Sequence, residues 1–161
     1  MPENNQRSAI LTTVMTPDMQ NFSGNVHGGD ILKLIDRAAY ACAARYAKKN
    51  VVTLSVDQVI FKKPIHVGEI VTFYASVNFV GRTSMEIGIK ITAENPLTGD
   101  IRHTNTCYLT WVAVDENGKP TALPPYTPET ETEKRRHREA QLRQALQKEY
   151  QQRHMAIKSN K

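Results

Sequence analysis

The sequence is poor in the residues that would supply reactive sulfur, a metal cluster or a membrane span. Only two cysteines occur in 161 residues, Cys42 and Cys107, and neither lies next to a basic residue that would activate its thiol. We expect small buried hydrophobic residues in a reducing compartment, without a disulfide and without a zinc site. No apolar stretch is long enough to span a bilayer, and residues 1–8 are polar, unlike a signal peptide. We therefore predict a soluble cytoplasmic protein with no membrane partner and no metal.

An excess of acidic residues is also lacking, because 21 Lys and Arg stand against 16 Asp and Glu. The basic excess is local. Between Glu129 and Lys161 nine basic residues face five acidic ones, which leaves the rest of the chain nearly neutral. A basic domain would favour nucleic acid, whereas a charge run in a tail is typical of a solvated surface. We expect no nucleic acid partner.

The most strongly periodic segment is the apolar run over residues 31–46, which predicts one long buried helix. At 100° per residue one wide face collects Ile31, Leu32, Leu34, Ile35, Ala38, Ala39, Cys42, Ala43 and Tyr46. Asp36 falls at the edge of that face. Because burial disfavours the charged form of a carboxylate, a lone acid beside an apolar face is costly to hold there. Asp36 is therefore a candidate catalytic base.

The residues just before this helix predict a binding site for an oxyanion. Gly28 and Gly29 allow backbone N–H groups to approach a ligand closely. The first turn of a helix has unpaired N–H donors and a partial positive charge. Taken alone, the same residues are more typical of a tight turn followed by a favourable first-turn acid, Asp30.

Alternating apolar residues predict a mainly antiparallel sheet. We expect a short edge strand over residues 7–15, a strand over 51–61 that Pro64 ends, a hairpin of 70–80 and 85–91 around Gly81-Arg82, and a last strand over 101–115. One early helix followed by four long strands favours an α+β fold in which the sheet wraps on the helix.

A proline-rich linker separates this domain from a charged tail. The linker contains Pro120, Pro124, Pro125 and Pro128. Proline cannot continue a sheet, so we expect one domain over residues 1–126 and a helix-prone tail over 127–161. In the tail, Leu142, Leu146 and Tyr150 form a thin stripe that we expect to pack partly on the domain or on another subunit.

A family resemblance supplements these patterns. The run Asn21-x-x-Gly24-Asn25-Val26-His27-Gly28-Gly29, followed by Ile35-Asp36, resembles the helix-start motif of the hot-dog-fold acyl-CoA thioesterases, in the cytosolic acyl-CoA hydrolase branch and its bacterial single-domain type. The segments 81–86 and 104–110 are similar to the same branch. The resemblance implies a long central helix wrapped by the sheet, and hydrolysis of fatty acyl-CoA to free fatty acid and coenzyme A. It also implies that no cofactor is needed beyond the coenzyme A of the substrate.

The resemblance implies roles for individual residues. Asp36 would act as base or nucleophile, Asn21 would orient water or the thioester carbonyl, and Gly28 and Gly29 would supply oxyanion donors. The substrate-binding residues would be His27, Gly81, Arg82, Thr83 and Ser84, the last four where the family holds the pantetheine arm and nucleotide.

Plainer roles remain open for several of these residues. Asn21 is compatible with a turn residue that caps its own backbone, His27 with a helix cap, and Arg82 with a solvated hairpin charge. Lys62 and Lys63 are further candidates for phosphate contacts.

Helix geometry predicts a partner subunit. Asp36 follows Gly29 by seven positions, about 10 Å along the helix axis, so one helix does not readily bring both to the same thioester carbon. A second subunit would do so, and it would also cover exposed strand edges. We expect a homo-oligomer that is at least a dimer and, by family resemblance, a trimer of dimers.

Two other functions fit the same residues. One is a hot-dog dehydratase or hydratase that uses a His and a carboxylate for proton transfer at the β-carbon. The other is a non-catalytic acyl-CoA-binding module.

Overall fold

The computed structural model describes residues 6–160. Most of the polar opening segment, for which we predicted no signal peptide, lies outside the described residues. The chain divides into two compact units between Pro124 and Pro125. Neither helix in residues 6–160 combines the length and the hydropathy needed to cross a bilayer.

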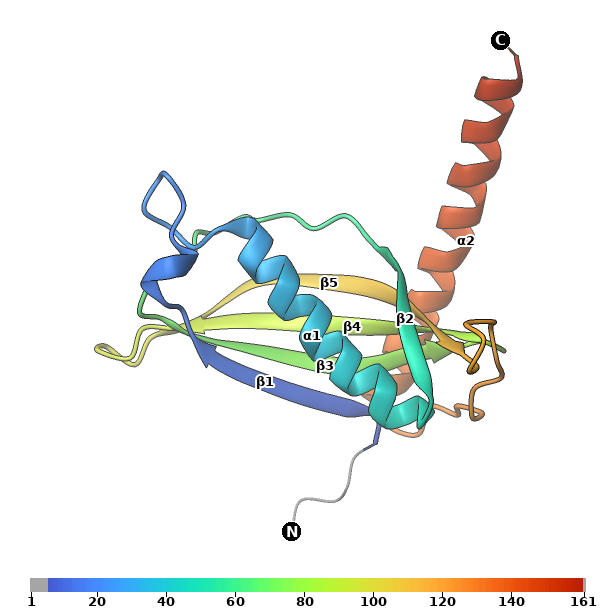
Figure 1. The fold of residues 1–161 in the computed structure, drawn as a ribbon, viewed down its shortest axis with the longest axis horizontal. Coiled ribbons are helices and arrows are strands. Elements are labelled where there is room, and N and C mark those ends of the chain that lie inside the picture. The colour runs from blue at the N-terminus through green and yellow to red at the C-terminus, as the bar shows by residue number, and fades with distance from the viewer. Residues whose placement is uncertain (1–5, 161) are drawn as a thin grey trace. The chain divides into compact units, whose positions relative to one another are not determined.

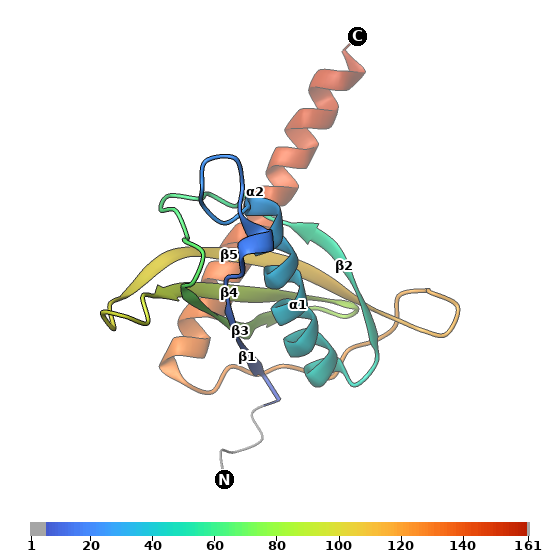
Figure 2. The ribbon, with the colours of Figure 1, turned by 60° about the vertical axis from the view of Figure 1, so that its left-hand side comes forward.

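The first unit is an antiparallel sheet that curves around one long helix (Figures 1 and 2). Its strands are β1 (Ser8–Val14), β2 (Asn50–Val56), β3 (Ile70–Val80), β4 (Ser84–Glu94) and β5 (Ile101–Val114). They lie in the order β1-β3-β4-β5-β2, and each neighbouring pair is antiparallel. The predicted α+β architecture is confirmed.

Helix α1 (Gly28–Ala47) follows a short 3-10 turn, η1 (Pro17–Met19). Its buried face is the predicted one with two differences. Ala47, which was not predicted, is also buried, and Leu32, which was predicted to be buried, is 39% exposed. The expectation for Leu32 was wrong because the helical wheel gives a wider face than the sheet covers. Leu32 instead lines a pocket with Val56 and Phe61.

The core lies between α1 and the concave face of the sheet. Alternate residues of the three central strands point toward the helix and are almost fully buried, among them Phe73, Ile89 and Leu109. Both cysteines are buried there with free thiols. Burial raises the pKa of the Cys42 and Cys107 thiols to about 12, so neither is a nucleophile near neutral pH.

Strand β2 is shorter than predicted. The alternating pattern continues to Phe61, but the strand ends at Val56. Backbone pairing with β5 stops at Val56↔Leu109, with one further hydrogen bond from Asp57 N–H to the Tyr108 carbonyl. Beyond Asp57 the chain leaves the sheet and runs back toward the start of α1, where Phe61 lies against Gly28 (Figure 1). The sequence of residues 57–61 still alternates, but among residues 6–160 no neighbouring strand pairs with this segment.

The second unit contains helix α2 (Glu131–Ser159), as the tail composition predicted. It begins with a capping box, in which the Thr130 side chain accepts from Glu133 N–H and the Glu133 side chain accepts from the Thr130 backbone. Ala140 is buried, whereas the three residues of the predicted stripe, Leu142, Leu146 and Tyr150, are exposed. The packing of that stripe on the domain or on another subunit stays a prediction.

Candidate active site

Asn21 shapes the loop before α1. Its Oδ1 accepts hydrogen bonds from the backbone N–H groups of Ser23 and Asn25, at 2.9 and 3.1 Å. Gly24 completes the turn with a φ of 83°, which favours glycine. Because two backbone donors fix which end of the amide is oxygen, Nδ2 is the free end, and among residues 6–160 it has no hydrogen-bond partner. Asn21 is thus a turn residue that presents an N–H₂ donor.

The start of α1 opens into a pocket of about 490 Å³. Asn21, Gly28, Lys62 and Lys63 all line it. The Gly28 N–H has no hydrogen-bond partner in the described part of the chain. The Gly29 N–H donates a long bond of 3.4 Å to Nδ1 of His27, the N-cap residue. The structure therefore brings together an amide, an unpaired helix N–H and two cations, the combination expected for an anionic or carbonyl ligand.

Asp36 lies about two turns further along α1, at the edge of its buried face, and is half-buried. Thr53 of β2 donates a hydrogen bond of 2.8 Å from Oγ1 to Oδ1 of Asp36. This bond fixes the carboxylate and leaves Oδ2 without a hydrogen-bond donor among residues 6–160. Asp36 does not line the pocket at the start of α1. An apolar pocket of about 360 Å³ is lined by Leu32, one turn before Asp36 on the helix, and by Ile35, which directly precedes Asp36.

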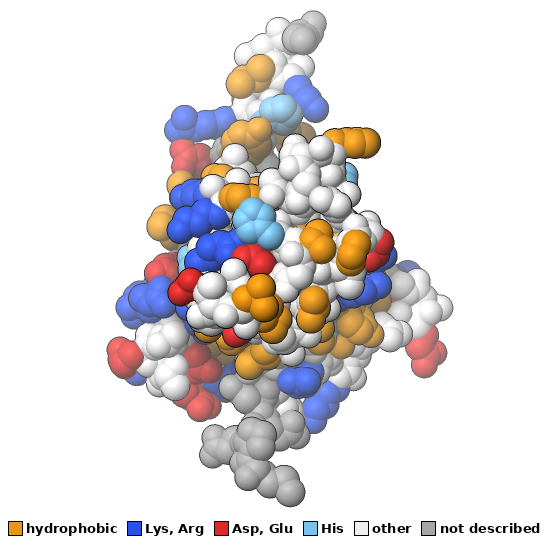
Figure 3. All heavy atoms as spheres, turned by 90° about the vertical axis from the view of Figure 1, so that its left-hand side faces the viewer, with side chains coloured by type: hydrophobic (Ala, Val, Ile, Leu, Met, Phe, Trp, Pro, Cys, Tyr) orange, Lys and Arg blue, Asp and Glu red, His pale blue; other side chains and the backbone are white. Residues whose placement is uncertain are grey.

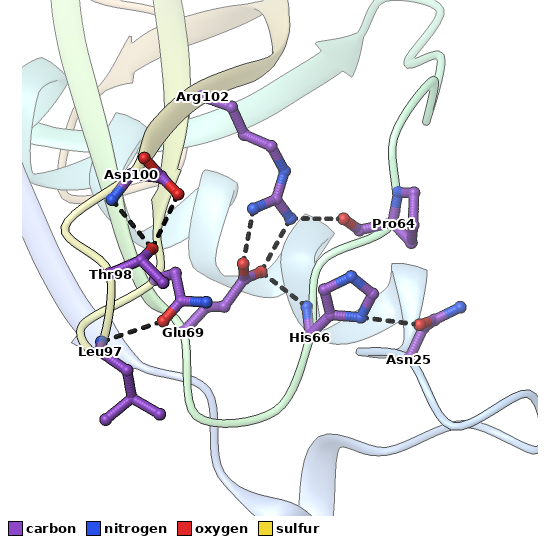
Figure 4. A network of polar contacts seen from close by, with 9 residues as sticks. Asn25, Pro64, His66, Glu69, Leu97, Thr98, Asp100 and Arg102 are labelled. Carbon is purple, nitrogen blue, oxygen red and sulfur yellow. Dashed lines mark hydrogen bonds and ion pairs between the residues drawn. The ribbon is translucent and has the colours of Figure 1, made fainter.

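A network of polar contacts attaches the segment after β2 to the rest of the site (Figure 4). The Glu69 carboxylate accepts from both terminal nitrogens of Arg102, at 2.5 and 2.8 Å, and from the His66 N–H at 2.8 Å. Arg102 also donates to the Pro64 carbonyl at 2.7 Å, and the His66 ring lies 3.1 Å from Asn25 Oδ1. The hydrogen bonds from Arg102 hold the pKa of Glu69 below its ordinary value.

The predicted turn Gly81-Arg82-Thr83-Ser84 lies at the other end of the sheet (Figure 1). It joins β3 to β4 beside the last residues of β5, since the Ala113 N–H donates to the Thr83 carbonyl. The start of α1 lies at the opposite end of the sheet (Figure 1). Within one chain, the structure therefore does not bring Arg82 to the pocket that Asn21 and Gly28 line.

Apolar side chains on the β2 edge of the sheet remain exposed. They are Tyr40 of α1, Val52, Leu54 and Val56 of β2, and Ile60 and Phe61 of the segment after it. A set of this kind at a sheet edge marks an interaction surface.

Sequence reasoning missed Thr53 and the Glu69–Arg102 ion pair. A threonine on the polar side of an alternating strand has no distinctive signature, and its meaning depends on which helix residue faces it. Glu69 and Arg102 lie far apart in sequence, so only the strand registers bring them together. Among residues 6–160, no group of three or more His, Cys, Asp or Glu side chains is arranged to hold a metal ion.

Comparison with known proteins identifies the class to which this fold and site belong. Residues 23–99 match the Thioesterase superfamily. Protein VdlD of Helicobacter pylori is 50% identical over 137 residues, 85% of this chain and 78% of that protein. The acyl-CoA thioester hydrolase YkhA of Bacillus subtilis, described as uncharacterized, is 34% identical over 155 residues, 96% of this chain and 90% of that protein.

Solved structures agree with these relatives. An apo-hexameric acyl-CoA thioesterase superposes with a TM-score of 0.85 and 38% identity, over 89% of this chain and 92% of that one. An acyl-CoA hydrolase of Staphylococcus aureus, solved with butyryl coenzyme A and coenzyme A, has a TM-score of 0.79 and 30% identity, over 93% and 94% of the two chains. Variants of that hydrolase with one aspartate, asparagine or threonine changed to alanine have also been solved.

The chain thus belongs to the acyl-CoA thioester hydrolases, a hot-dog-fold family of the Thioesterase superfamily.

Proposed function

We propose that this protein hydrolyses the thioester bond of fatty acyl-coenzyme A and releases a free carboxylic acid and coenzyme A. The observation that carries the proposal is the set formed by Asn21, Asp36 and Thr53. In the Staphylococcus aureus acyl-CoA hydrolase, the positions changed to alanine are an asparagine, an aspartate fifteen residues later and a threonine seventeen residues after that. Asn21, Asp36 and Thr53 have the same residue types at the same spacings.

In the proposed reaction Asp36 acts as the general base. The Thr53 hydroxyl holds one carboxylate oxygen at 2.8 Å, so the other oxygen is oriented to take a proton from water. The water oxygen then bonds to the thioester carbon, the carbon–sulfur bond breaks, and the coenzyme A sulfur leaves and takes up the proton. Direct attack by Asp36, which would form an acyl anhydride that water then opens, is the alternative use of the same carboxylate.

The start of α1 stabilises the charge that develops on the carbonyl oxygen. Gly28 and Asn21 line the pocket there, and the Gly28 N–H and the Asn21 Nδ2 are the proposed donors. Removal of one such donor typically costs a factor of about 100 to 1,000 in kcat. Gly29 is the weaker candidate, because its N–H already donates to His27.

The complete site forms between two subunits in this proposal. Asp36 does not line the pocket that holds Asn21 and Gly28, so a partner's carboxylate is needed at the thioester carbon. The exposed apolar edge around Val52, Leu54 and Val56 is a suitable dimer surface. The hexameric neighbour supports a trimer of such dimers.

The pockets and the buried thiols also support proposals for the acyl chain, the cofactor and the cellular location. The apolar pocket around Leu32 and Ile35 has the character needed for an acyl chain. The reaction needs no cofactor other than the coenzyme A of the substrate. Buried free thiols at Cys42 and Cys107 are consistent with the cytoplasm as its proposed location.

Thiol release from saturated acyl-CoA of several chain lengths tests the proposal. A saturated chain has no double bond to hydrate, so thiol release excludes both a hydratase and a non-catalytic binding module. Asp36→Asn keeps the shape of the side chain and should lower kcat by about a hundredfold or more. Thr53→Val removes only the hydroxyl and should lower kcat by about tenfold.

Matched controls are Asp18→Asn and Thr12→Val, which make the same chemical changes at exposed positions. A wild-type protein that releases no thiol from any acyl-CoA would refute the function. Near wild-type turnover by Asp36→Asn would refute the assignment of the base.

A further inference from the structure

The only tryptophan of the chain, Trp111, lies on β5 with its side chain inside the fold. It is 2% exposed, unlike the Lys, Arg and His side chains that gather on the face carrying the start of α1 (Figure 3). Its Nε1 is buried and has no hydrogen-bond partner among residues 6–160. A buried N–H without an acceptor costs free energy, and a phenylalanine would fill an apolar core without that cost. The indole therefore carries a cost that a purely structural role does not require.

The strand register places Trp111 directly opposite Thr53 in the β2–β5 pair. Directly opposed residues of an antiparallel pair project from the same face, with their Cβ atoms about 5 Å apart. The register shifts immediately after this pair, because Leu54 has no partner and Ser55 pairs with Thr110. A bulge of this kind aims the side chains beside it and is common next to active sites. Thr53 is thus held beside the indole.

The other neighbour of the indole is Tyr40 of α1. The centroids of the two rings lie 6.0 Å apart, with an angle of 56° between the ring planes, which is an ordinary geometry for an aromatic pair. Tyr40 follows Asp36 by four positions, so both side chains lie on one side of the helix, one turn apart. Trp111 therefore supports the turn of α1 that carries Asp36.

Trp111 connects the two elements that hold the candidate base. The carboxylate of Asp36 accepts the 2.8 Å hydrogen bond from Thr53, so this bond depends on the separation of α1 and β2. Among residues 6–160, β2 is an edge strand that pairs with β5 alone. Because core side chains are close-packed, the indole between Thr53 and Tyr40 sets the separation.

We propose that Trp111 is a positioning residue for the reaction. Its indole holds Thr53 and the turn of α1 from Asp36 to Tyr40 at the separation in which the threonine orients the base. The inference rests on the proposed function, in which Asp36 takes a proton from water. A misplacement of about 1 Å in a catalytic group can lower the rate about a hundredfold. The role of the indole therefore concerns kcat rather than KM.

Trp111→Phe tests the indole directly, because it removes the five-membered ring and the unpartnered Nε1 donor and keeps an aromatic ring. We expect kcat for saturated acyl-CoA to fall at least about threefold, with KM within about twofold of the wild type. The matched control is Phe73→Leu, which changes a buried aromatic residue of β3, three strands away from β2. It should lower the urea midpoint of unfolding and leave kcat within about twofold of the wild type.

A double-mutant cycle shows whether Trp111 acts through Thr53. If the indole works by orienting the threonine hydroxyl, Trp111→Phe has little left to change once that hydroxyl is gone. We therefore expect kcat of the double variant Trp111→Phe with Thr53→Val to lie within about twofold of Thr53→Val alone. A general loosening of the core would instead multiply with the effect of Thr53→Val.

The single tryptophan also gives a spectroscopic measure of the same contacts, because all indole fluorescence of the protein comes from Trp111. Tyr40→Leu and Thr53→Val each remove a group beside the indole, so we expect both to shift its emission and to increase its quenching by acrylamide. The matched controls are Tyr74→Leu and Thr12→Val, at exposed positions of β3 and β1. They should leave the emission unchanged. These variants keep the indole and give an answer if Trp111→Phe does not fold.

Two results would overturn the proposal. One is a folded Trp111→Phe variant whose kcat falls less than about threefold, or whose loss multiplies with that of Thr53→Val. The other is Trp111 emission that Tyr40→Leu and Thr53→Val change no more than their controls do. A wild type that releases no thiol from any acyl-CoA refutes the proposed function instead, and the emission then still decides whether the indole holds Thr53 and the helix.

Discussion

Mixing two inactive variants tests whether the active site is shared between subunits. Asn21 and Gly28 line one pocket, and Asp36 lies outside it, fixed by Thr53 further along the helix. If Asn21 of one subunit acts with Asp36 of its partner, chains with Asn21→Ala and chains with Asp36→Asn are each inactive alone. In a mixed dimer one site then carries both changes and the other site carries neither.

The expected recovery follows from counting dimers. Random pairing of equal amounts makes half of the dimers mixed, and each mixed dimer has one intact site of two. Unfolding and refolding the two variants together should therefore restore about a quarter of the wild-type activity. Each variant refolded alone is the control. A site within a single chain gives no recovery, because no chain carries both intact residues.

The assay is thiol release after refolding, with size-exclusion chromatography to verify that oligomers have reformed. Thr53 provides a second check, because it binds Asp36 of its own chain. Thr53→Val mixed with Asp36→Asn should give no more activity than the average of the two variants refolded separately. Reassembled Asn21→Ala and Asp36→Asn mixtures that remain as inactive as the separate variants would refute the shared site.

Three further changes test other parts of the structure. Arg82→Ala should raise the KM for acyl-CoA at least several-fold more than the KM for a short acyl-pantetheine, if a partner's turn contacts the nucleotide; equal effects would place Arg82 away from it. A chain that ends after Pro125 should still unfold cooperatively by circular dichroism, because the first unit ends at Pro124, and a non-cooperative transition would show that α2 is part of the core. Glu69→Gln should lower stability in urea at neutral pH. Since the pKa of Glu69 is lowered on folding, its contribution is present above its ordinary value of 4.5 and is lost as the pH falls below it. The difference between wild type and variant should therefore shrink in acid, and a constant difference from pH 7 to pH 3 would contradict this.

The sequence predicts the elements well where one local pattern decides them. The 70–80 strand has the predicted bounds, because its alternation lies between a turn signal and Gly81. The helix was predicted from apolar periodicity over 31–46 and spans Gly28–Ala47, since the wheel detects burial but not the first turn. The strand predicted to reach Phe61 ends at Val56, because a strand also needs a partner, and β5 does not accompany the chain further.

The candidate site was predictable residue by residue but not as an arrangement. Asn21, Gly28 and Asp36 have recognisable neighbours in the sequence, so each can be proposed from its own surroundings. Thr53, Glu69 and Arg102 acquire their roles only through pairing across the fold. The separation of Arg82 from the start of α1 likewise follows from strand order, which no local pattern contains.

The positions of the proposed catalytic groups along the chain have an evolutionary consequence. The asparagine, the helix N–H, the carboxylate and its threonine all lie between residues 21 and 53, whereas β3, β4 and β5 supply the long register pairs of the framework. Reaction chemistry and folding scaffold therefore occupy consecutive stretches of the gene. Recombination within the family can exchange the first stretch without shifting any register among β3, β4 and β5, provided that the incoming β2 keeps its pairing with β5.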